Sequence, residues 1–205
     1  MRLGVLGGTF DPVHIGHLLA AEQAREILAC DRVLLIPAGN PPHKPARVGA
    51  AYADRVRMLE IALAGIDGLA VSTLEADEGA PSYTVGTLRR LRAKAGPGVE
   101  LWLLMGSDSL LELPTWREPE TILDLASLGV YRRPGDPIGR TSGRPPELPA
   151  DLARLLAGRT WRLLPGPRVR LSSSEIRRRA ARGRSLRFLV PEAVREYILV
   201  QGLYR

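Results

Sequence analysis

Short apolar runs alternate with helix-like segments along most of this chain, and that alternation restricts the fold more than any other feature. The candidate strands are the apolar runs 3–6, 33–36, 69–74, 101–105 and 128–131. Between them, apolar residues recur at helical spacing, most clearly over 18–28, 52–64 and 85–91. Strands separated by helices in this way predict β-α-β units and a parallel sheet. The expected fold class is therefore α/β, a Rossmann-like doubly wound parallel sheet.

The last third of the chain has a different composition. Residues 133–149 are rich in Pro, Gly and Arg, which predicts a flexible loop of about that length. The piece beyond it is too small to fold alone, so we expect one domain over 1–205. A last strand at 161–164 and a small helical C-terminal part over about 172–205 would complete it.

Positive charge gathers late in the chain. The net charge is +7, and between Arg154 and Arg187 lie 11 arginines and a single acid, Glu175. Such clustering favours an anionic partner, such as a nucleotide or a nucleic acid. A solvated arginine-rich face explains the same pattern equally well.

The single cysteine, Cys30, excludes an internal disulfide and suits a reducing compartment. We interpret it as a small residue at a helix end rather than as a nucleophile. No stretch approaches the roughly 20 apolar residues that a membrane span needs, and Gly7, Gly8 and Asp11 interrupt the first apolar run before it can act as a signal peptide. We therefore expect a cytoplasmic protein without a membrane partner.

The string G-G-T-F-D-P-V-H-I-G-H at 7–17 follows the first predicted strand and opens the first helix. In an open α/β sheet, ligands bind beyond the carboxyl ends of the strands. Gly7 and Gly8 allow the backbone to approach a ligand closely. The free N–H groups at a helix start near Ile15 favour an anion. These features together predict a phosphate site.

His14 and His17 are three residues apart, so both side chains lie on one face of that first turn. Two such histidines can be metal ligands, buried groups with internal partners, or phosphate ligands. A zinc site needs further ligands, and cysteine is not available for it. Neither a P-loop nor a G-x-G-x-x-G motif offers another phosphate site. We therefore prefer the phosphate interpretation.

Two further segments carry groups that suit anions. His43 and Lys44 follow the second predicted strand, so their loop and the first motif are expected at the same edge of the sheet. A lysine there is a point charge for a phosphate. Near the other end, Ser172 and Glu175 have the spacing of a capping box, which predicts a helix start with Arg177 close by. That start is either a second anion site or a cap and nothing more.

At this point the sequence resembles the H-x-G-H nucleotidylyltransferases, and within them the bacterial nicotinate-nucleotide adenylyltransferases. The resemblance covers essentially the whole chain and follows the family's order of motifs. After 7–17 come N-P-P-H-K at 40–44, P-S-Y-T at 81–84, M-G-S-D-S at 105–109, P-T-W at 114–116 and L-S-S-S-E-I-R at 171–177. One departure is the third serine, Ser174, where the family has threonine, and serine keeps the hydroxyl.

The resemblance implies a role for each matching position. The nucleotides would be held by Gly7, Gly8, Thr9 and Phe10, with Gly106 and Ile176 completing that set. The ATP phosphates would contact His14, His17, Ser173, Ser174 and Arg177. Lys44 would hold the phosphate of the mononucleotide, and Asp108 a ribose. The nicotinate pocket would comprise Tyr83, Thr84 and Trp116, and further phosphate ligands would be Arg132 and Arg133. Trp116 can also be a partly buried core residue.

The activity implied is adenylyl transfer from ATP to nicotinate mononucleotide in NAD biosynthesis, which yields nicotinate adenine dinucleotide and pyrophosphate. Mg²⁺ would be carried with ATP, and no resident metal is expected. The partners would be these two nucleotides, without nucleic acid or membrane, and a homo-oligomer is left open. Two alternatives remain: phosphopantetheine adenylyltransferase or another H-x-G-H enzyme on the same fold, and a basic nucleic-acid-binding protein without catalysis.

Overall fold

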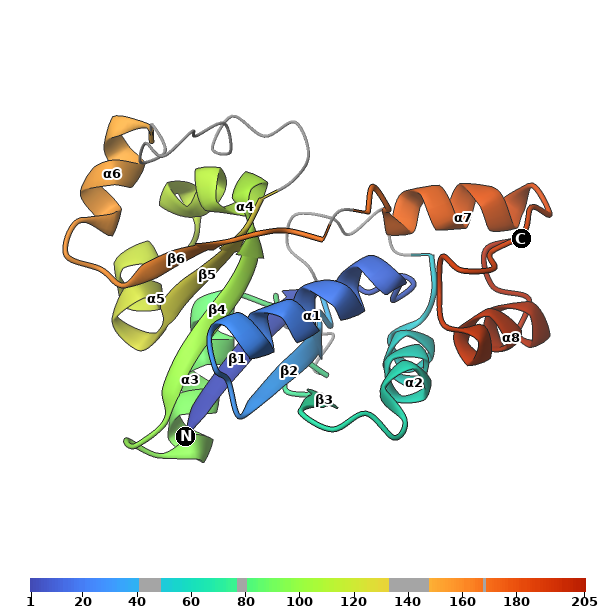
Figure 1. Cartoon of the computed structure of the whole chain (residues 1–205), viewed down its shortest axis with the longest axis horizontal. Helices are drawn as coiled ribbons and strands as arrows, with labels where there is room; N and C mark the ends of the chain where they lie inside the picture. Colours follow the sequence, from blue (N-terminus) through green and yellow to red (C-terminus); the bar gives the residue numbers. More distant parts are fainter. Residues whose placement is uncertain (41–48, 77–80, 133–147, 168) are drawn as a thin grey trace.

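The computed structural model describes residues 1–40, 49–76, 81–132, 148–167 and 169–205 (Figure 1). The strands are β1 (Arg2–Gly8), β2 (Arg32–Pro37), β3 (Leu69–Val71), β4 (Glu100–Gly106), β5 (Ser127–Tyr131) and β6 (Trp161–Leu164). The helices are α1 (Ile15–Ile27), α2 (Tyr52–Leu63), α3 (Thr84–Ala95), α4 (Ser107–Glu112), α5 (Pro119–Leu125), α6 (Ala150–Leu156), α7 (Ser173–Ala181) and α8 (Glu192–Val200). A 3₁₀ turn, η2 (Leu113–Thr115), follows α4.

The six strands form one sheet in the order β3-β2-β1-β4-β5-β6, and every neighbouring pair is parallel. The chain moves outward in one direction from β1 to β3, and then returns to β4 on the other side of β1. The strand order therefore reverses between β1 and β4, where an open α/β sheet binds its ligands. The predicted doubly wound α/β fold is confirmed.

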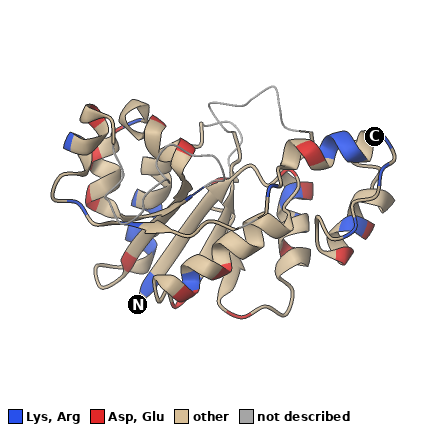
Figure 2. Cartoon of the chain, turned by 45° about the horizontal axis from the view of Figure 1, so that its top comes forward, with Lys and Arg blue, Asp and Glu red and all other residues tan. Residues whose placement is uncertain are grey.

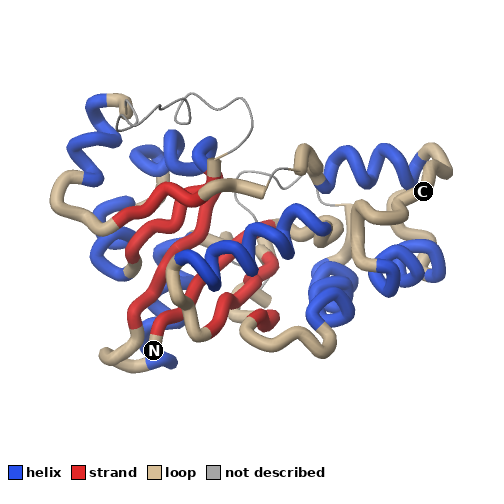
Figure 3. Tube along the Cα trace, viewed as in Figure 1, coloured by secondary structure: helices blue, strands red, loops and turns tan. Residues whose placement is uncertain are grey.

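Successive side chains along each strand point to opposite faces of the sheet. In β4, Trp102 and Leu104 pack with α1, α2 and α8, while Leu101 and Leu103 pack with α3, α5 and α6. Helices thus cover both faces, with α1 and α2 on one side (Figure 3). Because both faces are buried, the strands read as nearly continuous apolar runs in the sequence.

The C-terminal helices extend the molecule beyond the sheet, beside α2 (Figure 1). Val194 and Ile198 of α8 are buried in the same hydrophobic cluster as Met58 of α2. The helical C-terminal part therefore shares a core with one face of the sheet, which brings α7 near the loop after β1.

Some boundaries differ from those expected. β3 ends at Val71 rather than at residue 74, because only three of its residues pair with β2. The sequence analysis missed α4, α5 and α6, which have six or seven residues and span too few turns for a clear periodicity. Most of the predicted loop 133–149 lies outside the described residues, and α6 begins directly after it.

Cys30 lies in the core just after α1, 4% exposed. Burial raises the pKa of its thiol to about 11, so the thiol stays protonated at neutral pH, as a structural residue would. Among the described helices, none is both long and apolar enough to cross a membrane.

Candidate active site

A cavity of about 780 Å³ opens at the carboxyl ends of β1 and β4, where the strand order reverses. Most of the residues that the sequence analysis assigned to a nucleotide site line it. They are Gly7, Gly8, Thr9, Phe10, His14, His17, Tyr83, Thr84, Gly106, Asp108, Trp116, Arg132, Ser173, Ser174 and Arg177. The fold thus gathers residues from both ends of the chain around one space.

The backbone after β1 is shaped so that a ligand can approach it. A Cβ placed on Gly7 would meet nothing within 4 Å, so its backbone faces open space in the cavity. A Cβ on Gly8 would lie 3.2 Å from the ring of Phe10, which is buried and has a positive φ of 48°. Gly8 thus makes room for Phe10, while Gly7 leaves room for a ligand.

The two histidines cap α1 for each other. The backbone N–H of His17 donates to Nδ1 of His14 at 3.3 Å, and the N–H of His14 donates to Nδ1 of His17 at 3.2 Å. Their rings stack with centroids 3.6 Å apart. A Cβ on Gly16 would come within 3.1 Å of the His14 ring, so glycine is needed for this stack. The predicted helix start near Ile15 is confirmed.

This reciprocal cap decides which ring nitrogen can donate. Because Nδ1 of each ring accepts a backbone N–H, a neutral His14 or His17 must carry its proton on Nε2. Both rings line the cavity. The first turn of α1 therefore offers Nε2–H donors and a positive helix end to an anion.

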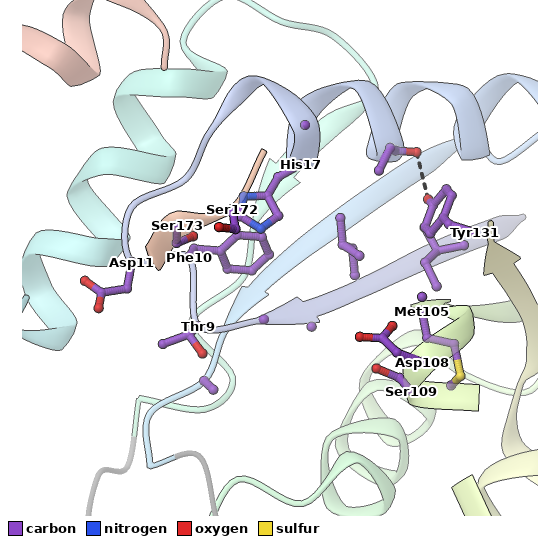
Figure 4. Close-up of a pocket in the computed structure, with 18 of the residues that line it drawn as sticks. Thr9, Phe10, Asp11, His17, Met105, Asp108, Ser109, Tyr131, Ser172 and Ser173 are labelled. Atoms are coloured by element: carbon purple, nitrogen blue, oxygen red, sulfur yellow. Dashed lines mark hydrogen bonds between the residues drawn. The ribbon is translucent and has the colours of Figure 1, made fainter. Parts of the chain in front are cut away.

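The start of α7 lines the same cavity. Ser172 is its N-cap and accepts the N–H of Glu175 at 3.2 Å, which confirms the predicted helix start. The Glu175 side chain does not return the bond and instead pairs with Arg178. Ser173 Oγ donates to the carbonyl of Pro12 at 2.9 Å and so fastens α7 to the loop after β1. Figure 4 shows Ser172 and Ser173 beside Phe10 and His17.

Asp11 organises this side of the site, although the sequence analysis assigned it no role. Its carboxylate is 1% exposed and accepts the N–H groups of Gly49 at 2.6 Å and Ala50 at 3.1 Å. Arg177 Nη1 lies 3.4 Å from the same carboxylate and donates to the Asp11 carbonyl at 2.7 Å. Asp11 thus orients an arginine that lines the cavity.

Arg55 is a second residue without an assigned role. Its side chain is buried beneath the site, and Nη1 donates to the carbonyls of Thr9 and Ala38 at 2.8 Å each. These carbonyls belong to the segments that follow β1 and β2. In the sequence, Arg55 resembles any arginine of a helix that also carries Arg57, so only the fold distinguishes it.

The opposite part of the cavity is aromatic. Trp116 and Tyr83 line it, and the guanidinium of Arg117 lies 4.9 Å from the centre of the Tyr83 ring. Trp116 is half-buried and also packs on the core, so the two interpretations of this residue are compatible. Beneath this wall, buried Glu75 accepts a hydrogen bond from Thr87 and so braces α3.

Side chains from β4 and α4 close the remaining side. Gly106 is the N-cap of α4, and Asp108 lies in its first turn. Thr9 and Phe10 lie on one side of the cavity, and Asp108 and Ser109 on the other (Figure 4). Arg132, directly after β5, also lines it.

Of the predicted site residues, one lies away from the cavity wall and two are not described by the structure. Lys44 and Arg133 lie outside the described residues. Ile176 is fully buried in the core, and its N–H donates to the Ser172 carbonyl. The structure therefore places the Ile176 side chain in the core beneath α7 and not in the cavity wall.

The cavity is lined by side chains of both charges: Arg117, Arg132, Arg170 and Arg177 on the basic side, and Asp11, Glu75, Asp108 and Glu112 on the acidic side. Figure 2 shows basic residues along α7, and Arg170 and Arg177 line the cavity. Within the described part of the chain, no group of three or more His, Cys, Asp or Glu side chains is placed to hold a metal ion.

Comparison with known proteins identifies the family. The model of the cytidylyltransferase-like family matches residues 5–179. A protein of Thermomicrobium roseum described as a probable nicotinate-nucleotide adenylyltransferase is 46% identical over all of this chain and 92% of its own length. A protein of Thermus thermophilus with the same description is 44% identical, with complete coverage of both chains. The chain belongs to the nicotinate-nucleotide adenylyltransferases.

Solved structures agree on the fold of this adenylyltransferase. The nicotinic acid mononucleotide adenylyltransferase of Plasmodium falciparum, solved as a complex with NaAD, aligns with a TM-score of 0.78. The alignment covers 99% of this chain and 97% of that one at 15% identity. The same enzyme complexed with APC aligns with a TM-score of 0.76. At this identity the likeness establishes the fold alone.

Proposed function

We propose that this enzyme transfers the adenylyl group of ATP to nicotinate mononucleotide, forming nicotinate adenine dinucleotide and pyrophosphate in NAD biosynthesis. Family membership supports the reaction. The observation that carries the assignment is one cavity with two unlike halves. The starts of α1 and α7, with His14, His17 and Arg177, suit phosphates, while Trp116 and Tyr83 suit a flat ring.

The chemistry follows from this division. An oxygen of the mononucleotide phosphate attacks the α-phosphorus of ATP, a new P–O bond forms, and the bond to the β-phosphate oxygen breaks in line. The attacking phosphate is already an anion, so no general base is required. Catalysis then consists of holding two phosphates together and neutralising the charge that develops on them. Hydrogen bonds from the Nε2–H groups of the histidines and the positive charge of the Arg177 guanidinium would stabilise that developing charge.

We propose that Mg²⁺ enters with ATP. A metal carried by phosphates needs few protein ligands, and Asp108 is a carboxylate within the cavity wall. When bound, the cation would neutralise the departing pyrophosphate. Lys44 remains a predicted ligand of the mononucleotide phosphate, and Arg133 of a second phosphate. The cytoplasm remains the proposed location, and neither nucleic acid nor a membrane is part of the proposal.

A pyrophosphate-release assay with three acceptors tests the proposed acceptor. With ATP and Mg²⁺, we expect rapid release with nicotinate mononucleotide, slower release with nicotinamide mononucleotide, and none with phosphopantetheine. Turnover with phosphopantetheine alone would assign the site to a different acceptor. No release with any of the three would contradict adenylyl transfer altogether.

Trp116→Ala is expected to raise the KM for nicotinate mononucleotide about tenfold and to leave the KM for ATP nearly unchanged. A tryptophan face attracts the cationic pyridinium ring by about 0.5 to 2 kcal/mol, and a loss of about 1.4 kcal/mol is tenfold in affinity. Steady-state kinetics with each nucleotide varied in turn measures the effect. Trp116→Phe should recover part of the loss, because a ring face remains.

Trp161→Ala is the matched control for Trp116. Trp161 of β6 is likewise half-buried against the same hydrophobic cluster, but it does not line the cavity. Its removal should lower Tm without a selective effect on either KM. If Trp116→Ala behaves in the same way, Trp116 is a packing residue and the stacking role is wrong.

A further inference from the structure

A single tyrosine links the chain after α8 to the loop after β1. The phenol O–H of Tyr204 donates to Oδ1 of Asp11 at 2.7 Å, across 193 residues of sequence. Tyr204 has a positive φ of 64°, a backbone conformation that residues other than glycine rarely adopt. In this conformation the Tyr204 hydroxyl lies within hydrogen-bond distance of the Asp11 carboxylate.

Asp11 joins Tyr204 to Arg177 of α7 and to the backbone just before α2. The Oδ1 atom that accepts the phenol also accepts the N–H of Ala50, and Oδ2 accepts the N–H of Gly49. Arg177 lies 3.4 Å from Oδ2 and donates to the Asp11 carbonyl. The residues Asp11 and Arg177 line the cavity, whereas Tyr204 is not among its lining residues.

Packing couples the same groups without hydrogen bonds. A Cβ on Gly49 would lie 3.1 Å from Cδ of Arg177 and 3.1 Å from the ring of Tyr204. The backbone of Gly49 thus packs between the side chains of Tyr204 and Arg177. In the sequence, Gly49 directly follows residues 41–48, the segment that carries Lys44.

The phenol is suited to act as a permanent donor. Burial, followed by the charge of Asp11, raises the pKa of Tyr204 above its usual value. The hydroxyl therefore keeps its proton throughout the neutral range, and the bond to Asp11 does not switch with pH.

We propose that Tyr204 is a positioning residue for adenylyl transfer. Its hydrogen bond holds the Asp11 carboxylate in the orientation in which Oδ2 aligns Arg177 with the phosphates. Tyr204 touches neither nucleotide and acts through Asp11. This inference rests on the proposed function, because it assumes that Arg177 stabilises the reacting phosphates.

Tyr204→Phe tests the inference, because it removes one hydroxyl and keeps the ring that packs on Gly49. We expect kcat with ATP and nicotinate mononucleotide to fall about tenfold, since a misplacement of about 1 Å costs up to about a hundredfold. Both KM values should change less than about threefold. Gly49→Ala should also lower kcat, because its Cβ would push Tyr204 and Arg177 apart.

Tyr197→Phe is the matched control. Tyr197 of α8 donates to Oδ1 of Asp54 on α2 at 2.8 Å, so this variant also breaks a Tyr–Asp bond between the C-terminal part and the rest of the chain. Neither Tyr197 nor Asp54 lines the cavity, and kcat should stay at the wild-type value. Tm should fall in both tyrosine variants, and by more in Tyr204→Phe, because its hydrogen bond is to the buried carboxylate of Asp11.

The outcomes separate this inference from the proposed function. Wild-type kcat in Tyr204→Phe, beside an active wild-type enzyme, would overturn the positioning role alone. An equal loss of kcat in Tyr197→Phe would also overturn it, because the effect would then be general destabilisation. A wild-type enzyme that does not turn over these two nucleotides would overturn the proposed function and this inference with it.

Discussion

His17→Ala is expected to lower kcat about 100- to 1,000-fold, the usual effect of removing one positioned donor from a transition state. The reason is geometric. Nδ1 of His17 accepts the N–H of His14, so a neutral His17 carries its proton on Nε2, and its ring lines the cavity. Steady-state pyrophosphate release measures kcat, and circular dichroism verifies that the fold is retained.

His17→Asn and His17→Gln separate capping from donation. An asparagine oxygen can take the place of Nδ1 and cap α1, but the side chain is too short to replace Nε2. A glutamine amide reaches nearer the place of Nε2. We expect His17→Asn to be as inactive as His17→Ala, with about 1 kcal/mol of cap stability retained, and His17→Gln to regain some turnover. A kcat near the wild-type value in either His17→Ala or His17→Asn would refute the donor role.

Asp11→Ala is expected to lower the free energy of unfolding by about 3 kcal/mol, because it removes one partner from a buried charged network. Two backbone N–H groups and the Tyr204 hydroxyl would lose their acceptor, and Arg177 would lose its carboxylate. For a chain of this size the loss corresponds to a fall in Tm of about 10 °C. Thermal unfolding followed by circular dichroism measures it.

Asp54→Ala provides the comparison for Asp11→Ala. Asp54 also accepts a tyrosine hydroxyl, from Tyr197, but it is only partly buried, and such exposed contacts contribute up to about 1 kcal/mol. Its Tm should fall by about 3 °C or less. Equal changes in Tm for the two variants would mean that the Asp11 network adds nothing special to stability.

Local patterns in the sequence were enough to predict the sheet and half of the site. Buried parallel strands are short and apolar, so β1, β2, β4 and β5 could be recognised from composition. The reciprocal cap of His14 and His17 depends on their spacing of three residues, which can be read directly from the sequence. The cap at Ser172 was predictable for the same reason.

Long-range partners are what the sequence could not predict. Asp11 stands inside the first motif, yet its partners are at Gly49, Ala50, Arg177 and Tyr204, and no local pattern connects them. Arg55 looks like a helix-surface arginine in the sequence, but it is buried and donates to the carbonyls of Thr9 and Ala38, which directly follow β1 and β2. Ile176 shows the converse case, since the side chain at a motif position assigned to the ligand is buried in the core.

The fate of labelled phosphorus tests the central claim most directly. The enzyme would be incubated with nicotinate mononucleotide, Mg²⁺ and ATP labelled at either the α- or the γ-phosphate, and the products would be separated and identified. The account predicts that α-label appears only in nicotinate adenine dinucleotide and that γ-label appears only in pyrophosphate, in equal molar amounts. Label from the γ-phosphate on the mononucleotide, or no labelled dinucleotide at all, would contradict adenylyl transfer at this site.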